Sequence, residues 1–583
     1  MRFFDYAWFN SFQITKKKES SVKILFREGI LPSLIVDEKG YVLYLPKPRR
    51  TRGGRGEYQG IPFDLDDSVH RRMVWGLFSA SLYHLSLHVA ASDYSLYSDW
   101  MEGRDPRLSR FVISLLEDAS LNAYLRVFWS TLIPAIAYAN ALSYLLLKPA
   151  ELIPRRQLRL MAAILSASTM RLIKGRLEKP LREEALRVVS YLRAAEEMLQ
   201  EYYLLRREEI IRGGDDATRM EGRVAEKKLG YADQIYGTLA RHGPPPEAPA
   251  LPYAEHHGES TVFSRRLPGE KRLMELTKRA AAILSPESEV PLEDSWTLWE
   301  REAEQNISDW LSYEARKEKI LSQYVAEGRD TRFRSFGFPD EDYAEFLRRR
   351  ERLSGPIRRA LTRLILYQNV LGEDPRKEAG VLDLQEAIQA MASKSMRSDV
   401  FITDELQNRR MTWGVLVDVS RSLRAFTGEE KDVVLCLAEV VKGMIFDPNT
   451  WGMFAFDNNF YVVKDFSENY TNDVKARIGG LRNSGLTYLP DAVKLVTRVL
   501  TRRYEEAKIL AIVSDGFPTG YEGAEEEFLK QVRETWRRGI GVIGISIKSR
   551  AVKRYIKTSC VVETPYDLMK KFVDAFFEYT ALL

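Results

Sequence analysis

The sequence predicts an α-helical N-terminal region followed by a C-terminal α/β domain with a doubly wound, mostly parallel sheet. From about Val69 to Ala240, and again from Gly269 to Ala390, apolar residues recur at spacings of three and four with Glu and Arg between them, which is the pattern of amphipathic helices. After Met411 the pattern changes to short apolar runs that alternate with amphipathic segments. Strands that alternate with helices are typical of a parallel sheet covered on both faces.

Each expected strand of the C-terminal domain is a short run of apolar residues. The carboxyl ends of such strands are where ligands bind in parallel sheets, so the residues that follow them are the first candidates for a site. The expected strands are 413–417, 452–456, 460–463, 508–513 and 540–546, and the expected helices are 433–444, 490–502, 525–538 and 567–579.

A chain of 583 residues exceeds what one hydrophobic core usually serves, so we expect two or three domains. The segment around Pro244, Pro245 and Pro246 cannot be helical, because proline lacks an N–H and has a fixed φ. We therefore expect a mobile surface linker there, which a protease would cut first. The expected division is 1–68 as an irregular region with short strands, 69–241 as a helical domain, 242–268 as the proline-rich linker, 269–410 as a helical region and 411–583 as the α/β domain.

The composition excludes several classes of protein. Hydrophobic residues make up 45% and charged residues 29%, which is ordinary for a folded globular chain, and 87 basic residues nearly balance 82 acidic ones, which argues against nucleic-acid binding. Cys436 and Cys560 give no disulfide framework, and the first residues lack a signal-peptide pattern, so we expect a cytoplasmic protein. The apolar run 128–147 contains Pro134 and Asn140, so we expect a buried helix and no membrane span, and leave peripheral membrane contact open.

Oxygen-bearing side chains follow two of the expected strands. The motif Asp418-Val-Ser420-Arg-Ser422 comes directly after the first strand. Thr487 lies in a later loop, and Asp515 follows the strand 508–513. Two carboxylates and three hydroxyls form a hard, all-oxygen set of donors, which suits Mg²⁺ or Mn²⁺ and not Zn²⁺. The alternative is that both serines cap the next helix and that Asp515 forms a turn.

This set resembles the metal-ion-dependent adhesion site, or MIDAS, of von Willebrand factor A-type domains, in which an Asp-x-Ser-x-Ser motif is followed by a threonine and then an aspartate. The resemblance implies that Ser420, Ser422 and Thr487 contact the metal. It also implies that Asp418 and Asp515 bind the metal directly or through water, and that an acidic residue of a partner fills one open coordination position. A site of this kind docks a partner and is not catalytic.

Four flanking motifs narrow the resemblance, and they are Tyr83 to His88, Phe111 to Asn122, Gly380 to Ile388 and Ser514 to Pro518. Together they resemble the NorD/CbbO group, whose members are partners of MoxR-type AAA+ ATPases, and more distantly the CobT subunit of cobalt chelatase. In two places the chain departs from the group: Phe517-Pro518-Thr519 stands where Lys-Pro-Asn-Asp is usual, and Arg421 stands where small or apolar residues are commoner. The departures leave the metal site intact but leave the partner and the target open.

A second candidate site contains two histidines. His84 and His88 are spaced i and i+4, so they share one helical face as in HExxH zinc proteases, and Glu117 or Asp118 could supply a third ligand. Leu85 stands where such a protease has its general base, so we expect no peptide hydrolysis. Two interpretations remain, which are a degenerate zincin-like helix pair and two histidines held by buried carboxylates.

The sequence thus favours a non-enzymatic adaptor. What the resemblance implies is that the chain works with a hexameric MoxR-type AAA+ ATPase to activate or remodel a client enzyme, by insertion or release of a cofactor or metal. The chain itself has no phosphate-binding loop, so ATP hydrolysis is expected in the partner. The alternatives are a divergent zinc metallohydrolase that uses His84 and His88, and a chelatase subunit, whose typical long acidic segment is missing.

Overall fold

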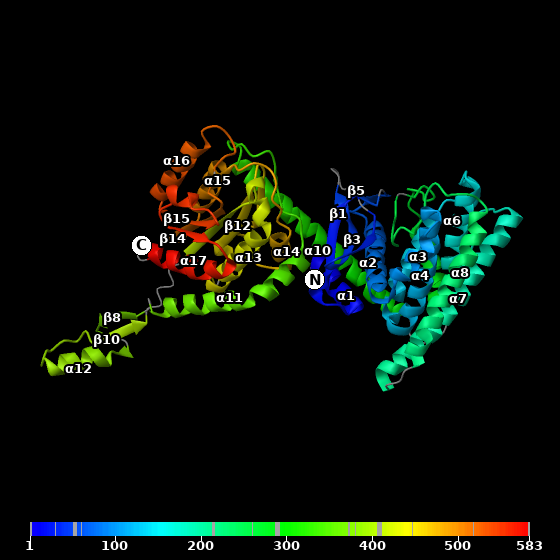
Figure 1. Cartoon of the computed structure of the whole chain (residues 1–583), viewed down its shortest axis with the longest axis horizontal. Helices are drawn as coiled ribbons and strands as arrows, with labels where there is room; N and C mark the ends of the chain where they lie inside the picture. The colour runs from blue at the N-terminus through cyan, green and yellow to red at the C-terminus, as the bar shows by residue number, and fades with distance from the viewer. Residues whose placement is uncertain are drawn as a thin grey trace. The chain divides into compact units, whose positions relative to one another are not determined.

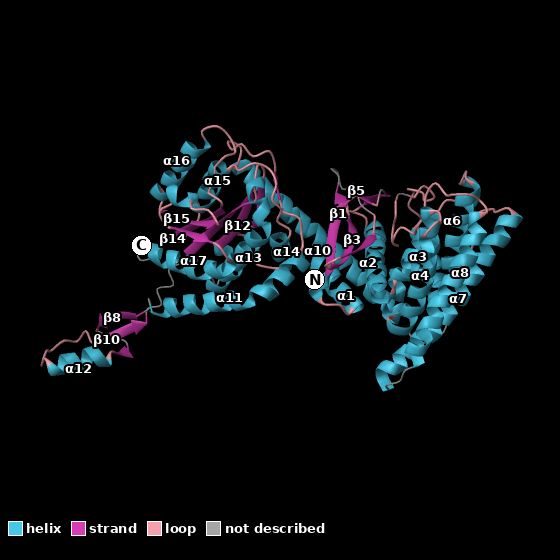
Figure 2. Cartoon of the chain, in the orientation of Figure 1, coloured by secondary structure: helices cyan, strands magenta, loops and turns pink. Residues whose placement is uncertain are grey.

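The computed structural model describes residues 3–580 apart from 30, 51–54, 60, 213–215, 259, 286–291, 371–372, 379–380, 405–410, 446 and 517. The chain forms two compact units, Met1–Tyr313 and Glu314–Leu583. Figure 1 and Figure 2 show that the first unit is mostly helical and that the second contains a sheet with helices around it. The predicted α-helical N-terminal region and mostly parallel C-terminal sheet are confirmed at this level.

The first unit begins with helix α1 (Phe3–Thr15), which was not predicted in the region 1–68, continues with short strands and then forms helices whose starts follow from the sequence. The Asp67 carboxylate accepts from the Val69 N–H and so caps α2, and Asp105 caps α4 in the same way, just before Pro106. The strands are β1 (Val22–Glu28), β2 (Ser33–Asp37), β3 (Gly40–Lys47), β4 (Arg49–Arg50), β5 (Arg55–Tyr58) and β6 (Ile61–Asp64), in sheets of order β1-β3-β2 and β4-β5-β6. The helices are α1 (Phe3–Thr15), α2 (Ser68–Ala91), α3 (Ser98–Met101), α4 (Pro106–Phe128), α5 (Ile133–Leu146), α6 (Arg156–Met170), α7 (Lys179–Arg212), α8 (Asp216–Ala240) and α9 (Glu270–Leu284), followed by α10 (Leu292–Glu327), which continues into the second unit.

Helix α5 accounts for most of the apolar run 128–147. It is a helix of 14 residues, and Ile136, Tyr138 and Leu142 on it are buried in the core of the first unit. Among the residues that the structure describes, no helix combines the length and the apolar character needed to cross a bilayer.

The proline-rich segment belongs to the first unit. Leu251, Tyr253 and Val262 are buried in its core, and the Tyr253 hydroxyl donates to Oδ1 of Asn140 at 2.6 Å. The segment 242–268 is therefore not a linker between the two units, whereas its mobility stays a prediction. Consecutive prolines exclude a helix, but they leave the apolar side chains that follow them free to pack.

The core of the second unit is a seven-stranded sheet of order β16-β15-β14-β11-β12-β13-β7. Neighbouring strands are parallel except for the antiparallel pair β12 and β13. Leu416 of β11 packs in the cluster that contains α15 residues, whereas Trp413 packs on Phe576 of α17, so both faces are covered. The strands are β7 (Phe336–Gly337), β11 (Met411–Asp418), β12 (Trp451–Phe456), β13 (Phe460–Lys464), β14 (Ala507–Ser514), β15 (Ile540–Ile547) and β16 (Ser559–Val562). The helices after α10 are α11 (Tyr343–Val370), α13 (Thr427–Met444), α14 (Asn472–Gly479), α15 (Leu489–Thr501), α16 (Ala524–Arg537) and α17 (Pro565–Thr580).

The second unit begins at Glu314, earlier than the predicted boundary between residues 410 and 411. Strand β7 pairs with the start of β13, and α11 packs on α13, where Arg349 Nη1 lies 2.8 Å from Asp432 Oδ1. The predicted helical region 269–410 thus contributes to the sheet. It also holds a small separate sheet, of order β8-β10-β9, while residues 405–410 lie outside the described residues. The bounds are β8 (Glu373–Lys377), β9 (Val381–Leu382), α12 (Leu384–Ala392) and β10 (Phe401–Asp404).

The close approach of α14 to the start of α11 depends on a glycine. A Cβ at Gly479 would lie 2.1 Å from the backbone oxygen of Asp342. Gly479→Ala would therefore push the backbone of α14 away from the residues at the start of α11. We expect a loss of roughly 1–3 kcal/mol in the free energy of unfolding, measured by urea denaturation. Gly337→Ala is the control, because a Cβ there meets nothing within 4 Å. Equal stability of the two variants would contradict this account of the packing.

Candidate functional site

The carboxyl ends of two central strands bring the first acidic residues of the predicted site together. Strands β11 and β14 are parallel neighbours, with Val417 opposite Val513, so Asp418 and Ser514 end adjacent strands. The Ser514 hydroxyl donates to Asp418 Oδ2 at 2.7 Å. Asp515 follows Ser514 directly, which places the second predicted aspartate at the same edge of the sheet.

The two serines of the motif lead from this buried carboxylate toward the surface. The Ser420 N–H donates to Asp418 Oδ1 at 3.0 Å, and the Oγ atoms of Ser420 and Ser422 lie 2.9 Å apart. Ser420 is buried, whereas Ser422 is exposed. Ser420 precedes the 3₁₀ helix Arg421–Phe426, but its side chain makes no capping hydrogen bond there. The alternative, in which the Ser420 side chain caps the next helix, is therefore wrong.

The loop that carries Thr487 packs against the motif. The Ser484 N–H donates to the Val419 carbonyl at 2.8 Å, and the Arg421 N–H donates to the Gly485 carbonyl at 3.2 Å. Gly485 has a φ of +63°, and a Cβ there would lie 1.9 Å from Oδ1 of Asn458, so only glycine fits this turn. Thr487 itself is buried. The loop thus brings the third predicted element to the strand ends.

Several carboxyl groups lie close together at this edge of the sheet. Asp418 is fully buried, and desolvation followed by the charge of Asp515 raises its pKa to about 7. No lysine or arginine forms an ion pair with Asp418 in the part of the chain that the structure describes. Burial also raises the pKa of Glu430 well above its ordinary value, and the charges of Asp418 and Asp515 add to this. A divalent cation would offset the repulsion, and the all-oxygen donor set fits Mg²⁺ or Mn²⁺.

Glu430 is a residue of this site that the sequence analysis did not find. It lies in the first turn of α13, is buried, and accepts a hydrogen bond from Nδ2 of Asn483. Its position close behind the motif Asp418 to Ser422 in the sequence was a hint, since only the 3₁₀ helix Arg421–Phe426 separates α13 from that motif. Its side chain could not be assigned to the site without knowing which face of α13 meets the sheet.

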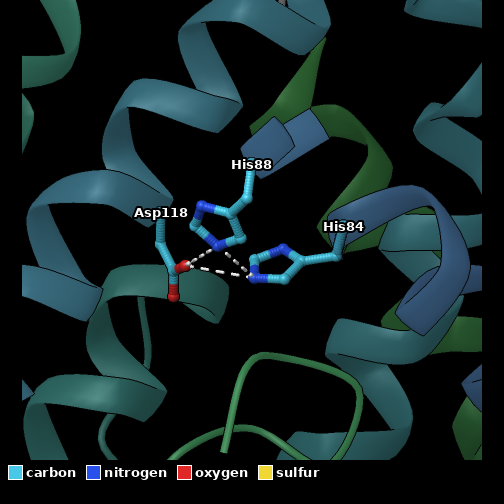
Figure 3. A group of neighbouring side chains, drawn as sticks. All are labelled: His84, His88 and Asp118. Carbon is cyan, nitrogen blue, oxygen red and sulfur yellow. Dashed lines mark hydrogen bonds and ion pairs between the residues drawn. The ribbon is translucent and has the colours of Figure 1, made fainter. Parts of the chain in front are cut away.

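The second predicted site also forms, but with a different carboxylate. His84 and His88 of α2 meet Asp118 of α4, and Figure 3 shows the three side chains pointing toward one another. The two Nε2 atoms lie 3.0 Å apart, and Asp118 Oδ1 lies 3.3 Å from Nε2 of His84 and 3.8 Å from Nε2 of His88. Burial, followed by the charge of His84, holds the pKa of His88 well below its ordinary value, so His88 is neutral.

Glu117 is not part of this cluster, and its assignment as a third ligand is wrong. It is fully buried and accepts hydrogen bonds from Nζ of Lys228 at 2.6 Å and from the Tyr97 hydroxyl at 2.7 Å. Successive residues of an α-helix point about 100° apart, so Glu117 and Asp118 face different neighbours. Asp118, the other ligand considered from the sequence, is the one that faces the histidines.

Comparisons with known proteins give little about function. No protein-family model matches the chain. An uncharacterized protein of Pseudomonas aeruginosa is similar to it, with 24% identity over 188 residues, which cover 29% of this chain and 30% of the relative. The chain therefore spans under a third of the length of that relative, and the similarity assigns neither a family nor an activity.

The raised pKa of Asp418 predicts that metal binding at this edge depends on pH. Mn²⁺ binds the ionised carboxylate, so protons compete with the metal as the pH falls below about 7. We expect the affinity for Mn²⁺ to fall by up to about tenfold per pH unit below that value and to level off above it. The loss of the free Mn²⁺ signal in electron paramagnetic resonance measures this across the range from about pH 5 to about pH 8.

Glu430→Gln is the control for the pH titration, because it removes a neighbouring acid and leaves Asp418 in place. The slope below neutral pH should persist in this variant. An affinity that does not change with pH in the wild type would show that Asp418 does not titrate with the metal.

Proposed function

We propose that this chain is a non-enzymatic, metal-dependent adaptor, in which a Mg²⁺ ion at the edge of the second unit's sheet captures an acidic side chain of a partner protein. The observation that carries the proposal is the arrangement of the donors. The site runs from the fully buried Asp418 through the buried Ser420 to the exposed Ser422, so an ion held there has one side toward solvent. Hydroxyl donors are neutral, so the ion keeps positive charge for an incoming carboxylate.

The partner follows from the resemblance to the NorD/CbbO group. We propose that the adaptor works in the cytoplasm with a hexameric MoxR-type AAA+ ATPase and conveys its ATP-driven remodelling to a client enzyme. The acidic side chain on the metal would come from the client or from the ATPase. The two buried cysteines, Cys436 and Cys560, are both free thiols, which supports a reducing compartment.

A zinc metallohydrolase remains the second candidate, because His84, His88 and Asp118 do meet in the first unit. Leu85 is fully buried and supplies no general base at the position where HExxH proteases have one. Turnover of peptides by the isolated chain that disappears in His84→Ala would favour this candidate over the adaptor.

Complex formation with the ATPase tests the adaptor directly. The full chain and its MoxR-type ATPase, mixed with a non-hydrolysable ATP analogue, should elute together from a sizing column in Mg²⁺ and separately in EDTA. Asp418→Ala should raise the Kd of the complex at least about tenfold, which corresponds to only about 1.4 kcal/mol.

Asp399→Asn is the matched control for this experiment. It removes a carboxylate of the second unit that pairs with Arg397 at 2.9 Å, away from the strand ends. The control should form the complex as the wild type does. A complex of equal yield in EDTA, or with Asp418→Ala, would contradict the proposed function.

A further inference from the structure

The first unit holds a polar cluster in an otherwise apolar core. Helix α2 is buried along most of its length, with Leu85 and Leu87 beside the two histidines. His84 and His88 are 6% and 3% exposed, so neither imidazole is solvated. Buried polar groups are costly unless they are paired or bind an ion, and such clusters in folded proteins are enriched at functional sites.

The geometry of the cluster is that of a metal site. The three ligand atoms, Nε2 of His84, Nε2 of His88 and Oδ1 of Asp118, are 3.0, 3.3 and 3.8 Å apart. A triangle with these sides has a point about 2.0 Å from all three corners, and Zn²⁺ binds imidazole nitrogen and carboxylate oxygen at about 2.0–2.2 Å. Hydrogen bonding explains only the shortest side, because both distances to Asp118 exceed the usual N–H···O range.

The surroundings of His88 orient its Nε2 lone pair toward the cluster. The Tyr94 hydroxyl donates to Oε2 of Glu255 at 2.9 Å, so its oxygen is left to accept from Nδ1 of His88, which lies 3.1 Å away. Oγ of Ser92 lies 2.8 Å from the same Nδ1. With the proton on Nδ1, His88 presents a lone pair at Nε2. Histidines that bind a metal typically donate their other ring N–H to an acceptor, and the Tyr94 hydroxyl would be that acceptor here.

An open position adjoins the cluster. A cavity of about 50 Å³ is lined by His84 and Asp118 together with Asn122, Asn140 and Thr169. The rest of its lining is largely apolar and includes Leu87, Leu115 and Ile136. Its volume suits one or two water molecules or a small anion held by the polar groups. Three protein ligands with a fourth position open to such a cavity are the arrangement of zinc sites that exchange a ligand.

We propose that His84, His88 and Asp118 bind one Zn²⁺ ion whose fourth coordination position is open to water or a small anion in this cavity. Two imidazoles and a carboxylate suit borderline transition metals, whereas the all-oxygen site of the second unit suits Mg²⁺. The ligand separations favour a tetrahedral ion, in which about 3.3 Å separates the ligands, over an octahedral one, in which about 3.0 Å does. This proposal departs from the sequence expectation, which was Mg²⁺ or Mn²⁺ without zinc. The leucine at position 85 argues against hydrolysis but not against binding.

The test uses the full chain, stripped of metal with a chelator and titrated with Zn²⁺ by calorimetry. We expect one tight Zn²⁺ per chain, retained in Asp418→Ala and weakened at least about 100-fold in His84→Ala. Asp118→Asn, which keeps the side-chain volume, should weaken Zn²⁺ binding at least about tenfold. His242→Ala should bind as the wild type does, because His242 pairs with Glu184 at 2.7 Å outside the cluster.

A second measurement uses the wild type with Co²⁺ in place of Zn²⁺. It tests the metal site even where a variant fails to fold. Bound Co²⁺ should give the intense visible absorption of a tetrahedral ion, and azide should shift it by occupying the open position. The proposal is overturned if the wild type takes up no Zn²⁺, if His84→Ala and Asp118→Asn bind it unchanged, or if Asp418→Ala abolishes it. Bound Co²⁺ without a tetrahedral spectrum, or without a response to azide, would overturn the open tetrahedral site.

Discussion

The burial of one carboxylate, that of Asp418, is the constraint on which the rest of the second unit depends. Strand β11 lies inside the sheet between β12 and β14, so its last residue cannot reach bulk water. A serine hydroxyl and a backbone N–H donate hydrogen bonds to it, while burial, followed by the charge of Asp515, raises its pKa. Such a group is stable when protonated or bound to a cation. The sheet order that forms the core therefore also buries a carboxyl group that a bound cation would stabilise in its ionised form.

Much of this site could be predicted from the sequence because it depends on local pattern. Apolar runs predict the strands, and residues that follow parallel strands must meet at one edge, so Asp418 and Asp515 could be paired before any coordinates. The contribution of β7 to the sheet could not be predicted from such a pattern. Its two residues, Phe336 and Gly337, carry no strand signal, and they pair with β13 only because α10 and α11 bring that segment to the sheet edge.

The first unit shows a different limit of sequence reasoning. Spacing placed His84 and His88 on one face, but the choice between Glu117 and Asp118 depends on the rotation of α4, which only packing decides. The proline-rich segment is similar, because its prolines exclude a helix but do not reveal that Tyr253 hydrogen-bonds to Asn140 in the core. Each unit thus brings together, in a polar cluster, elements that are distant in sequence. The cluster of the second unit consists of oxygen donors, and the cluster of the first unit includes two imidazole nitrogens.

A crystal of the full chain soaked in Mn²⁺, with diffraction data collected at the manganese absorption edge, tests the central claim most directly. The account predicts an anomalous difference peak about 2.2 Å from the hydroxyl oxygens of Ser420 and Ser422, with Asp418 beside it directly or through water. A map with no peak at these strand ends, or with Mn²⁺ only at the histidine cluster, would contradict it.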